Sequence, residues 1–211
     1  MDKYRRSLLA AFTLVPFAAM AQRAGDNAAY TTLRKELPLE SPGKIEVAEF
    51  FWYGCIHCYN LEPLLEAWVP KLAPDVYFRR IPAVFNERWA FDATIFYAFE
   101  ALGVLEKVHR TFFDAIHKDR LKTDNPQALA EWAGKNGLEP KKLDATMKSF
   151  GVQSKTKRAN QLTGAAAIDG TPALMVQGRY TISTEQGGSR EGMLATADRL
   201  IAAVRKSLAA R

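Results

Sequence analysis

The sequence has only two cysteines in 211 residues, Cys55 and Cys58, and they stand three positions apart. So small a number excludes a framework of structural disulfides. A zinc site normally needs four ligands, and no second cysteine pair is present. A bond between residues this close would remove little entropy from the unfolded chain, so it would stabilise the fold poorly. The pair therefore favours redox chemistry.

Long apolar runs and a strong charge of one sign are also missing after the first 21 residues. No later stretch is long and apolar enough to cross a membrane. Residues 1–21 combine a basic start, an apolar run and a small-residue ending, Ala19-Met20-Ala21, which is typical of a signal peptide. The formal charge of +6 includes three basic and one acidic leader residues, which leaves about +4 for the mature chain. These charges are scattered, so we expect no nucleic-acid partner.

The stretch Glu49 to Cys58 carries the chemistry, and it reads Glu-Phe-Phe-Trp-Tyr-Gly-Cys-Ile-His-Cys. Residues 45–53 are rich in β-branched and aromatic side chains, which predicts a buried strand. Gly54 ends that strand, and helical spacing follows, so Cys55 falls at a helix N-terminus. Free backbone N–H groups and the helix dipole stabilise an anion there. A protonated His57 would add positive charge, so we expect a reactive thiolate at Cys55.

Glu49 is unusual in this strand because its neighbours are apolar. A carboxyl group is costly to bury unless it is protonated or paired. An edge strand with Glu49 facing water is the alternative. Phe50, Phe51 and Trp52 leave no polar face, so we favour a buried acid, with Arg80 on the next predicted strand as its partner.

Residues 87–150 change to a helical pattern of three or four helices. Asn125-Pro126 is a good helix start, because a capping residue precedes proline at the first helical position. Gly137 and Gly151 are placed where helices would end. His109 and His117 have no carboxylate or cysteine to complete a metal set, so we interpret them as surface residues. We expect no metal site.

The Cys-x-x-Cys motif after an apolar strand, with His57 inside it and Pro63 behind it, resembles the thioredoxin superfamily. The histidine points to the DsbA branch, the bacterial periplasmic thiol oxidases. Gly170-Thr171-Pro172 resembles the cis-proline loop of this fold. In that loop the peptide bond before the proline is cis, which costs little free energy before proline. The Thr171 backbone would then pair with an extended substrate beside Ile56. Ile56 stands where the best-known members carry proline.

The resemblance implies an α/β protein, a thioredoxin fold with an inserted all-helical domain. We predict a signal peptide at 1–21, a discontinuous thioredoxin-like domain at 22–86 and 151–211, and a helical domain at 87–150. In thioredoxin-like folds a buried acid at this position relays protons to the second cysteine, and the resemblance implies that role for Glu49.

These features predict a periplasmic, monomeric thiol–disulfide oxidoreductase that donates a Cys55–Cys58 disulfide to reduced, unfolded exported proteins through a mixed disulfide at Cys55. It would need no cofactor beyond that disulfide, and the resemblance implies that a DsbB-like quinone-linked membrane protein reoxidises it. A reductase or isomerase on the same fold is the nearest alternative. A holdase without redox activity and a carrier of a soft metal are alternatives of another class.

Overall fold

The computed structural model describes residues 29–210, so the predicted leader lies outside the described part. Five strands form one sheet in the order β1-β5-β4-β2-β3. Strands β2 and β3 are parallel, and the other neighbouring pairs are antiparallel. The strands are β1 (Thr31–Thr32), β2 (Ile45–Phe51), β3 (Val76–Pro82), β4 (Ala173–Val176) and β5 (Tyr180–Ser183).

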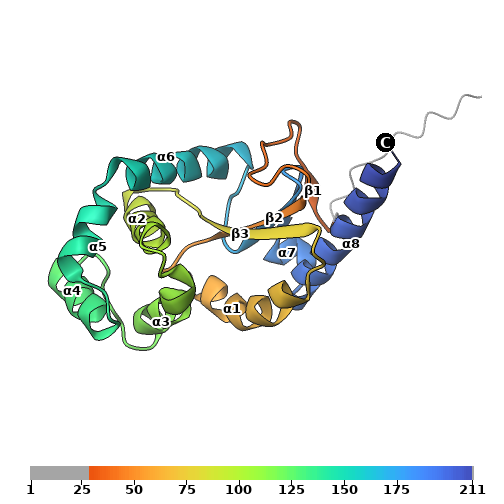
Figure 1. Cartoon of the computed structure of the whole chain (residues 1–211). Coiled ribbons are helices and arrows are strands. Elements are labelled where there is room, and N and C mark those ends of the chain that lie inside the picture. Colours follow the sequence, from red (N-terminus) through yellow and green to blue (C-terminus); the bar gives the residue numbers. More distant parts are fainter. Residues whose placement is uncertain (1–28, 211) are drawn as a thin grey trace, which may run out of the picture.

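Helices cover both faces of the sheet, and α2, α3, α4 and α5 gather at one end (Figure 1). Because β2 is entirely buried, its side chains pack on both faces. Helix α8 contacts α1 and the strands β2, β4 and β5, while α6 contacts β3. The helices are α1 (Ile56–Trp68), α2 (Glu87–Ala101), α3 (Leu105–His117), α4 (Pro126–Lys135), α5 (Pro140–Met147), α6 (Phe150–Ala165), α7 (Thr184–Gly187) and α8 (Arg190–Ala209), with a short 3-10 turn η1 (Val69–Lys71) after α1.

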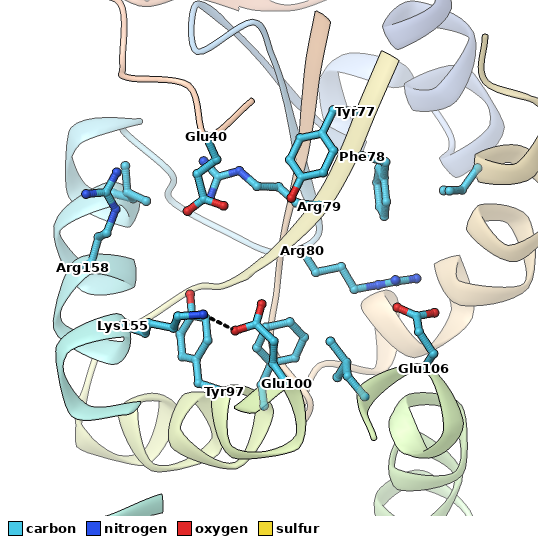
Figure 2. Close-up of a pocket in the computed structure, with 14 residues that line it drawn as sticks. Glu40, Tyr77, Phe78, Arg79, Arg80, Tyr97, Glu100, Glu106, Lys155 and Arg158 are labelled. Atoms are coloured by element: carbon cyan, nitrogen blue, oxygen red, sulfur yellow. Dashed lines mark hydrogen bonds and ion pairs between the residues drawn. The ribbon is translucent and has the colours of Figure 1, made fainter. Parts of the chain in front are cut away.

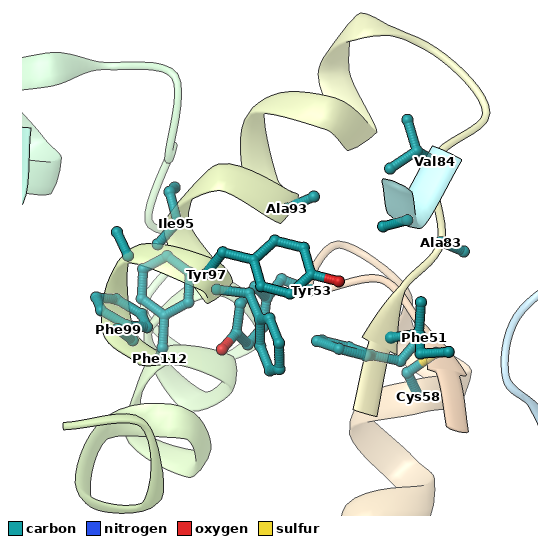
Figure 3. Close-up of a cluster of buried hydrophobic side chains, with 14 of the residues drawn as sticks. Phe51, Tyr53, Cys58, Ala83, Val84, Ala93, Ile95, Tyr97, Phe99 and Phe112 are labelled. Carbon is teal, nitrogen blue, oxygen red and sulfur yellow. The ribbon is translucent and has the colours of Figure 1, made fainter. Parts of the chain in front are cut away.

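Two hydrophobic clusters hold these layers together. The smaller one lies under α8 and contains Val47, Leu65 and Ile182. The larger one continues from the sheet into the helical end of the molecule and is rich in aromatic rings (Figure 3). Fully buried Tyr53 and Phe112 belong to it, and their ring centroids lie 4.7 Å apart. Aromatic packing therefore joins the helices to the strand that precedes the cysteines.

The helix starts follow the sequence more closely than the helix ends do. Asn125 caps α4 by accepting hydrogen bonds from two backbone N–H groups, and Pro126 is the first helical residue, as predicted. Gly137 has a positive φ of 76° just after α4, as a helix end requires. The helix end predicted at Gly151 is wrong. Ser149 caps α6 there, so Gly151 lies in the first turn of that helix.

The observed topology is a thioredoxin fold with helices inserted between β3 and α6, so the predicted fold class is confirmed. Among residues 29–210, the helices all fall short of the length and apolar character that crossing a bilayer would take.

Candidate active site

The two cysteines lie where β2 passes into α1. The Cys55 N–H donates to the Trp52 carbonyl (3.0 Å), and Cys55 is the N-cap residue of α1. Cys55 is half-buried, Cys58 is fully buried, and both are free thiols. An attacking group from outside can therefore reach the Cys55 sulfur, while Cys58 is shielded.

The surroundings push the pKa values of the two thiols in opposite directions. The Cys58 thiol donates a hydrogen bond to the Cys55 sulfur, and the Thr171 side chain and the backbone N–H groups of Cys58 and His57 add to it. Together they lower the pKa of Cys55 to about 5, although partial burial opposes them. Burial raises the pKa of Cys58 well above its usual value, and its hydrogen bond to Cys55 adds to that effect. Near neutral pH, Cys55 is therefore the thiolate and Cys58 the thiol.

The loop before β4 meets the cysteines from the other side. Pairing of Ala173 with Phe50 brings the start of β4 beside β2. The Thr171–Pro172 peptide bond is cis, and the Thr171 carbonyl oxygen lies 3.3 Å from Cys55 Sγ, where it can accept a hydrogen bond from Cys55 only when the thiol is protonated. Ile56 is 48% exposed. Ile56, Thr171 and Pro172, which the sequence predicts to face substrate, thus border the half-buried sulfur.

His57 lies in the first turn of α1 and is exposed. Its backbone N–H is one of the groups that lower the pKa of Cys55. The effect of its imidazole on the thiolate stays a prediction.

Glu49 is fully buried, as the sequence predicts. It stands directly across from Arg80 in the pairing of β2 with β3, and Arg80 Nε lies 3.2 Å from Glu49 Oε2. Burial raises the pKa of Glu49 to about 8, and the nearby Glu62 carboxylate adds to that effect, while Arg80 opposes it. A group that gains and loses a proton near neutral pH thus lies close to the cysteine pair.

Two further polar residues in this region escaped the sequence interpretation. Glu62 is buried on α1, four residues after Cys58, and Arg80 Nη2 donates to Glu62 Oε2 over 3.0 Å. His109 is only 6% exposed, so its interpretation as a surface residue was wrong. Its spacing from Leu105 and Phe112 on the apolar face of α3 was the signal that could have revealed it.

His117 is also not a surface residue, because it is half-buried against the segment that leads to Cys55. Its Nε2–H donates to the Tyr53 carbonyl oxygen over 2.8 Å, and its ring stacks on Tyr59 at a centroid distance of 4.8 Å. Tyr59 in turn donates to Asp114 of α3 over 2.8 Å. Helix α3 therefore steadies both sides of the cysteine motif.

Within the described part of the chain, His, Cys, Asp and Glu side chains form no group of three or more that could hold a metal ion. The chemistry that the arrangement provides is an accessible thiolate next to a protected thiol and a protonatable acid.

Comparison with known proteins agrees with this geometry. The family model described as DSBA-like thioredoxin domain matches residues 80–197. The thiol:disulfide interchange protein DsbA of Azotobacter vinelandii is 42% identical over 172 residues, which is 82% of this chain and 80% of that protein. DsbA of Pseudomonas aeruginosa PAO1 is 36% identical over 195 residues, 92% of each chain.

Solved structures give the same result. The crystal structure of Pseudomonas aeruginosa DsbA superposes with a TM-score of 0.82 at 36% identity, covering 86% of this chain and 94% of that one. The Neisseria meningitidis oxidoreductase NmDsbA1 gives a TM-score of 0.75 at 30% identity, with 87% and 95% coverage. The chain therefore belongs to the DsbA-like thioredoxin domain family and is a thiol:disulfide oxidoreductase.

Proposed function

We propose that this protein donates a Cys55–Cys58 disulfide to reduced, unfolded proteins newly exported to the periplasm. The observation that carries the proposal is the contrast between the two thiols. Cys55 is half-buried with a pKa of about 5, and Cys58 is buried with a raised pKa. A thiolate stabilised to this degree favours the dithiol over the disulfide, so the oxidised pair tends to take up electrons.

Each step of the reaction uses a specific sulfur. A substrate thiolate attacks Sγ of Cys55, the Cys55–Cys58 bond breaks, and Cys58 leaves with the electron pair. Cys58 then takes a proton, for which we assign the buried Glu49 as the source, because its carboxyl group is close enough to act on the pKa of Cys58. A second substrate thiolate attacks the substrate sulfur of the mixed disulfide and releases Cys55 as the thiolate. Two electrons have then passed from the substrate dithiol to the cysteine pair.

The half-exposed side chain of Ile56 and the Thr171 backbone beside Cys55 support a role in contacting an extended substrate. The substrate then needs no specific sequence, because backbone pairing and one apolar contact suffice. No bound cofactor enters the reaction. A DsbB-like membrane protein that passes the electrons to a quinone would restore the disulfide, and the protein would work as a monomer.

The roles of the two cysteines can be tested by trapping. Cys58→Ser should accumulate mixed disulfides between Cys55 and exported proteins, visible as bands on non-reducing gels that disappear on reduction. Cys55→Ser is the matched control and should trap almost none, because Cys58 is shielded. Equal trapping by both variants, or trapping by Cys55→Ser alone, would refute the assignment.

A further inference from the structure

The buried charges beside the cysteine pair do not balance. The carboxyl groups of Glu49 and Glu62 are both buried, and the guanidinium of Arg80 lies within 3.4 Å of both. One positive charge cannot neutralise two carboxylates, and burying an uncompensated charge is costly. One of the two carboxyl groups must therefore keep its proton near neutral pH.

The hydrogen bonds of Arg80 decide which of the two carboxyl groups is ionised. Arg80 reaches from β3 toward the helices, with Glu106 of α3 close to its guanidinium (Figure 2). It donates to Glu62 from Nε to Oε1 over 3.4 Å and from Nη2 to Oε2 over 3.0 Å. Its Nε is also 3.2 Å from Glu49 Oε2, but this contact is too poorly aligned for a good hydrogen bond, and neither Glu49 oxygen has another donor among the residues that the structure describes. A carboxylate needs such donors when it is buried, so the ionised member is Glu62.

A second pair of residues holds Glu62 in place. His109 Nε2 lies 3.3 Å from Glu62 Oε1, and His109 Nδ1 lies 2.8 Å from the Tyr53 hydroxyl. Burial lowers the pKa of His109, although the Glu62 carboxylate opposes this, so the imidazole is neutral. A neutral ring that donates from Nε2 to Glu62 must accept at Nδ1, and Tyr53 supplies that proton. The rings of Phe51 and Phe113 enclose this ring with centroids 5.4 and 5.2 Å from its own.

These contacts give Glu62 a lower pKa than usual. Burial alone would raise it, but the hydrogen bond from His109 and the charge and hydrogen bonds of Arg80 outweigh that effect. The titratable and charged groups that act on Glu49 and Glu62, or on the residues that hold them, come from every element packed here. They are Tyr53 after β2, Arg80 of β3, Cys55 and Cys58 at α1, Asp92 of α2, and Glu106 and His109 of α3.

We propose that Glu62, held by His109 and Tyr53, is a positioning residue that claims the Arg80 guanidinium and thereby keeps Glu49 protonated as the proton partner of Cys58. The proposal rests on the proposed function, because it assigns regulation of the same site. Without Glu62, Arg80 would pair with Glu49 and the neighbouring negative charge would vanish. Glu49 would then ionise at lower pH and hold its proton less often.

The direct test is a ¹³C NMR titration of the Glu49 carboxyl in oxidised protein, compared with the Glu62→Gln variant. We expect the pKa of Glu49 to fall by about one to three units, the usual effect of an opposite charge at this distance. Glu106→Gln is the matched control, because it removes a charge near Arg80 without removing a hydrogen-bonded partner, and it should shift the titration much less. An unchanged Glu49 titration in Glu62→Gln, or an equal shift in Glu106→Gln, would overturn the proposal.

A second variant covers the case in which Glu62→Gln does not fold. His109→Phe keeps an aromatic ring among the surrounding rings but removes a donor to Glu62. It should raise the pKa of Glu62 and lower that of Glu49, so that the two titrations move toward each other. Two separate titrations that stay in place would overturn the proposal.

A kinetic measurement connects the network to the reaction. In a mixed disulfide of Cys55 with glutathione, Cys58 attacks Sγ of Cys55, glutathione leaves as the thiolate, and the Cys58 proton passes to Glu49. The rate should rise with pH as Glu49 ionises, and this rise should move to lower pH in Glu62→Gln, which a purely structural defect would not cause. Trapping by Cys58→Ser tests the proposed function independently of both measurements.

Discussion

At the scale of single residues, the buried Glu49 lowers the stability of the folded protein near neutral pH because it keeps a proton there. Glu49 is ionised in the unfolded chain above its usual pKa of 4.5, but it stays protonated in the folded protein up to about pH 8. Folding must therefore bind a proton, and this cost grows from pH 4.5 to pH 8. The contribution of Glu49 to stability is thus most favourable below pH 4.5 and is lost as the pH rises.

Glu49→Gln should consequently stabilise the reduced protein, in which both cysteines are free as in this structure. Glutamine has nearly the same shape and cannot ionise, so we expect the free energy of unfolding at pH 7 to increase by about 1–3 kcal/mol. Denaturant unfolding at several pH values measures this difference. It should shrink toward zero near pH 4, and a variant that is less stable than the wild type at pH 7 would contradict the assignment of a protonated Glu49.

His57 lies two residues after Cys55, and the effect of its imidazole on the Cys55 thiolate can be measured. If its imidazole stabilises the Cys55 thiolate, His57→Ala should raise the pKa of Cys55 and make the disulfide less oxidising. Each pKa unit corresponds to about 30 mV for this two-electron couple. The thiolate absorbance during a pH titration gives the pKa, and equilibration with glutathione gives the potential. No change in either would mean that the backbone donors and Cys58 act without the imidazole.

Some residues of this site could be found from the sequence and others could not. Cys55 and Cys58 are recognisable by their spacing, and Glu49 by its place among apolar neighbours in the strand that leads to them. The partner across the sheet, Arg80, followed from the next predicted strand. Glu62 was missed because it lies on α1 among other polar residues, which gives it no distinguishing pattern. The role of His109 was missed because it lies on a different helix, α3. Only tertiary packing brings them within hydrogen-bonding distance.

At the scale of elements, the junction between β2 and α1 has no room for a side chain at Gly54. A Cβ there would overlap the Trp52 ring. That ring stacks on Trp89 at a centroid distance of 4.3 Å and donates from Nε1 to Asp92 over 2.8 Å. The turn that presents Cys55 is therefore fixed by packing against α2.

Gly54→Ala should displace the Trp52 indole and destabilise the protein by about 1–3 kcal/mol, the usual cost of overpacking. Denaturant unfolding and the near-UV signal of the tryptophans measure this. Gly134→Ala is the matched control, since a Cβ at that position of α4 meets no atom within 4 Å, and it should stabilise the helix by roughly 1 kcal/mol. Equal effects of the two substitutions would show that Trp52 yields freely.

The helix pattern shows why element ends are harder to predict than element starts. Asn125-Pro126 carries its own capping chemistry, so its position is decided locally. Gly151 misleads because a glycine can end a helix or stand in the first turn of one, and Ser149 decides between the two by capping α6. The nearby glycine at position 137 does end a helix because its φ is positive.

At the scale of the whole molecule, the sequence predicts the fold because strand, motif and proline loop occur in the order that this topology needs. Sequence periodicity could not give the packing of α3 against the cysteine motif, which depends on aromatic contacts across the two parts of the chain. The division into a domain at 87–150 and a discontinuous domain around it stays a prediction, as does the signal peptide.

The central claim is that the cysteine pair is a net oxidant, and its redox equilibrium with glutathione tests that claim most directly. The mature protein is equilibrated in glutathione buffers of known potential, and the dithiol fraction is measured after acid quenching and alkylation. At about −200 mV, the stabilised Cys55 thiolate predicts that most molecules carry the dithiol. A population that is mostly disulfide at that potential would contradict the oxidase assignment and favour a reductase.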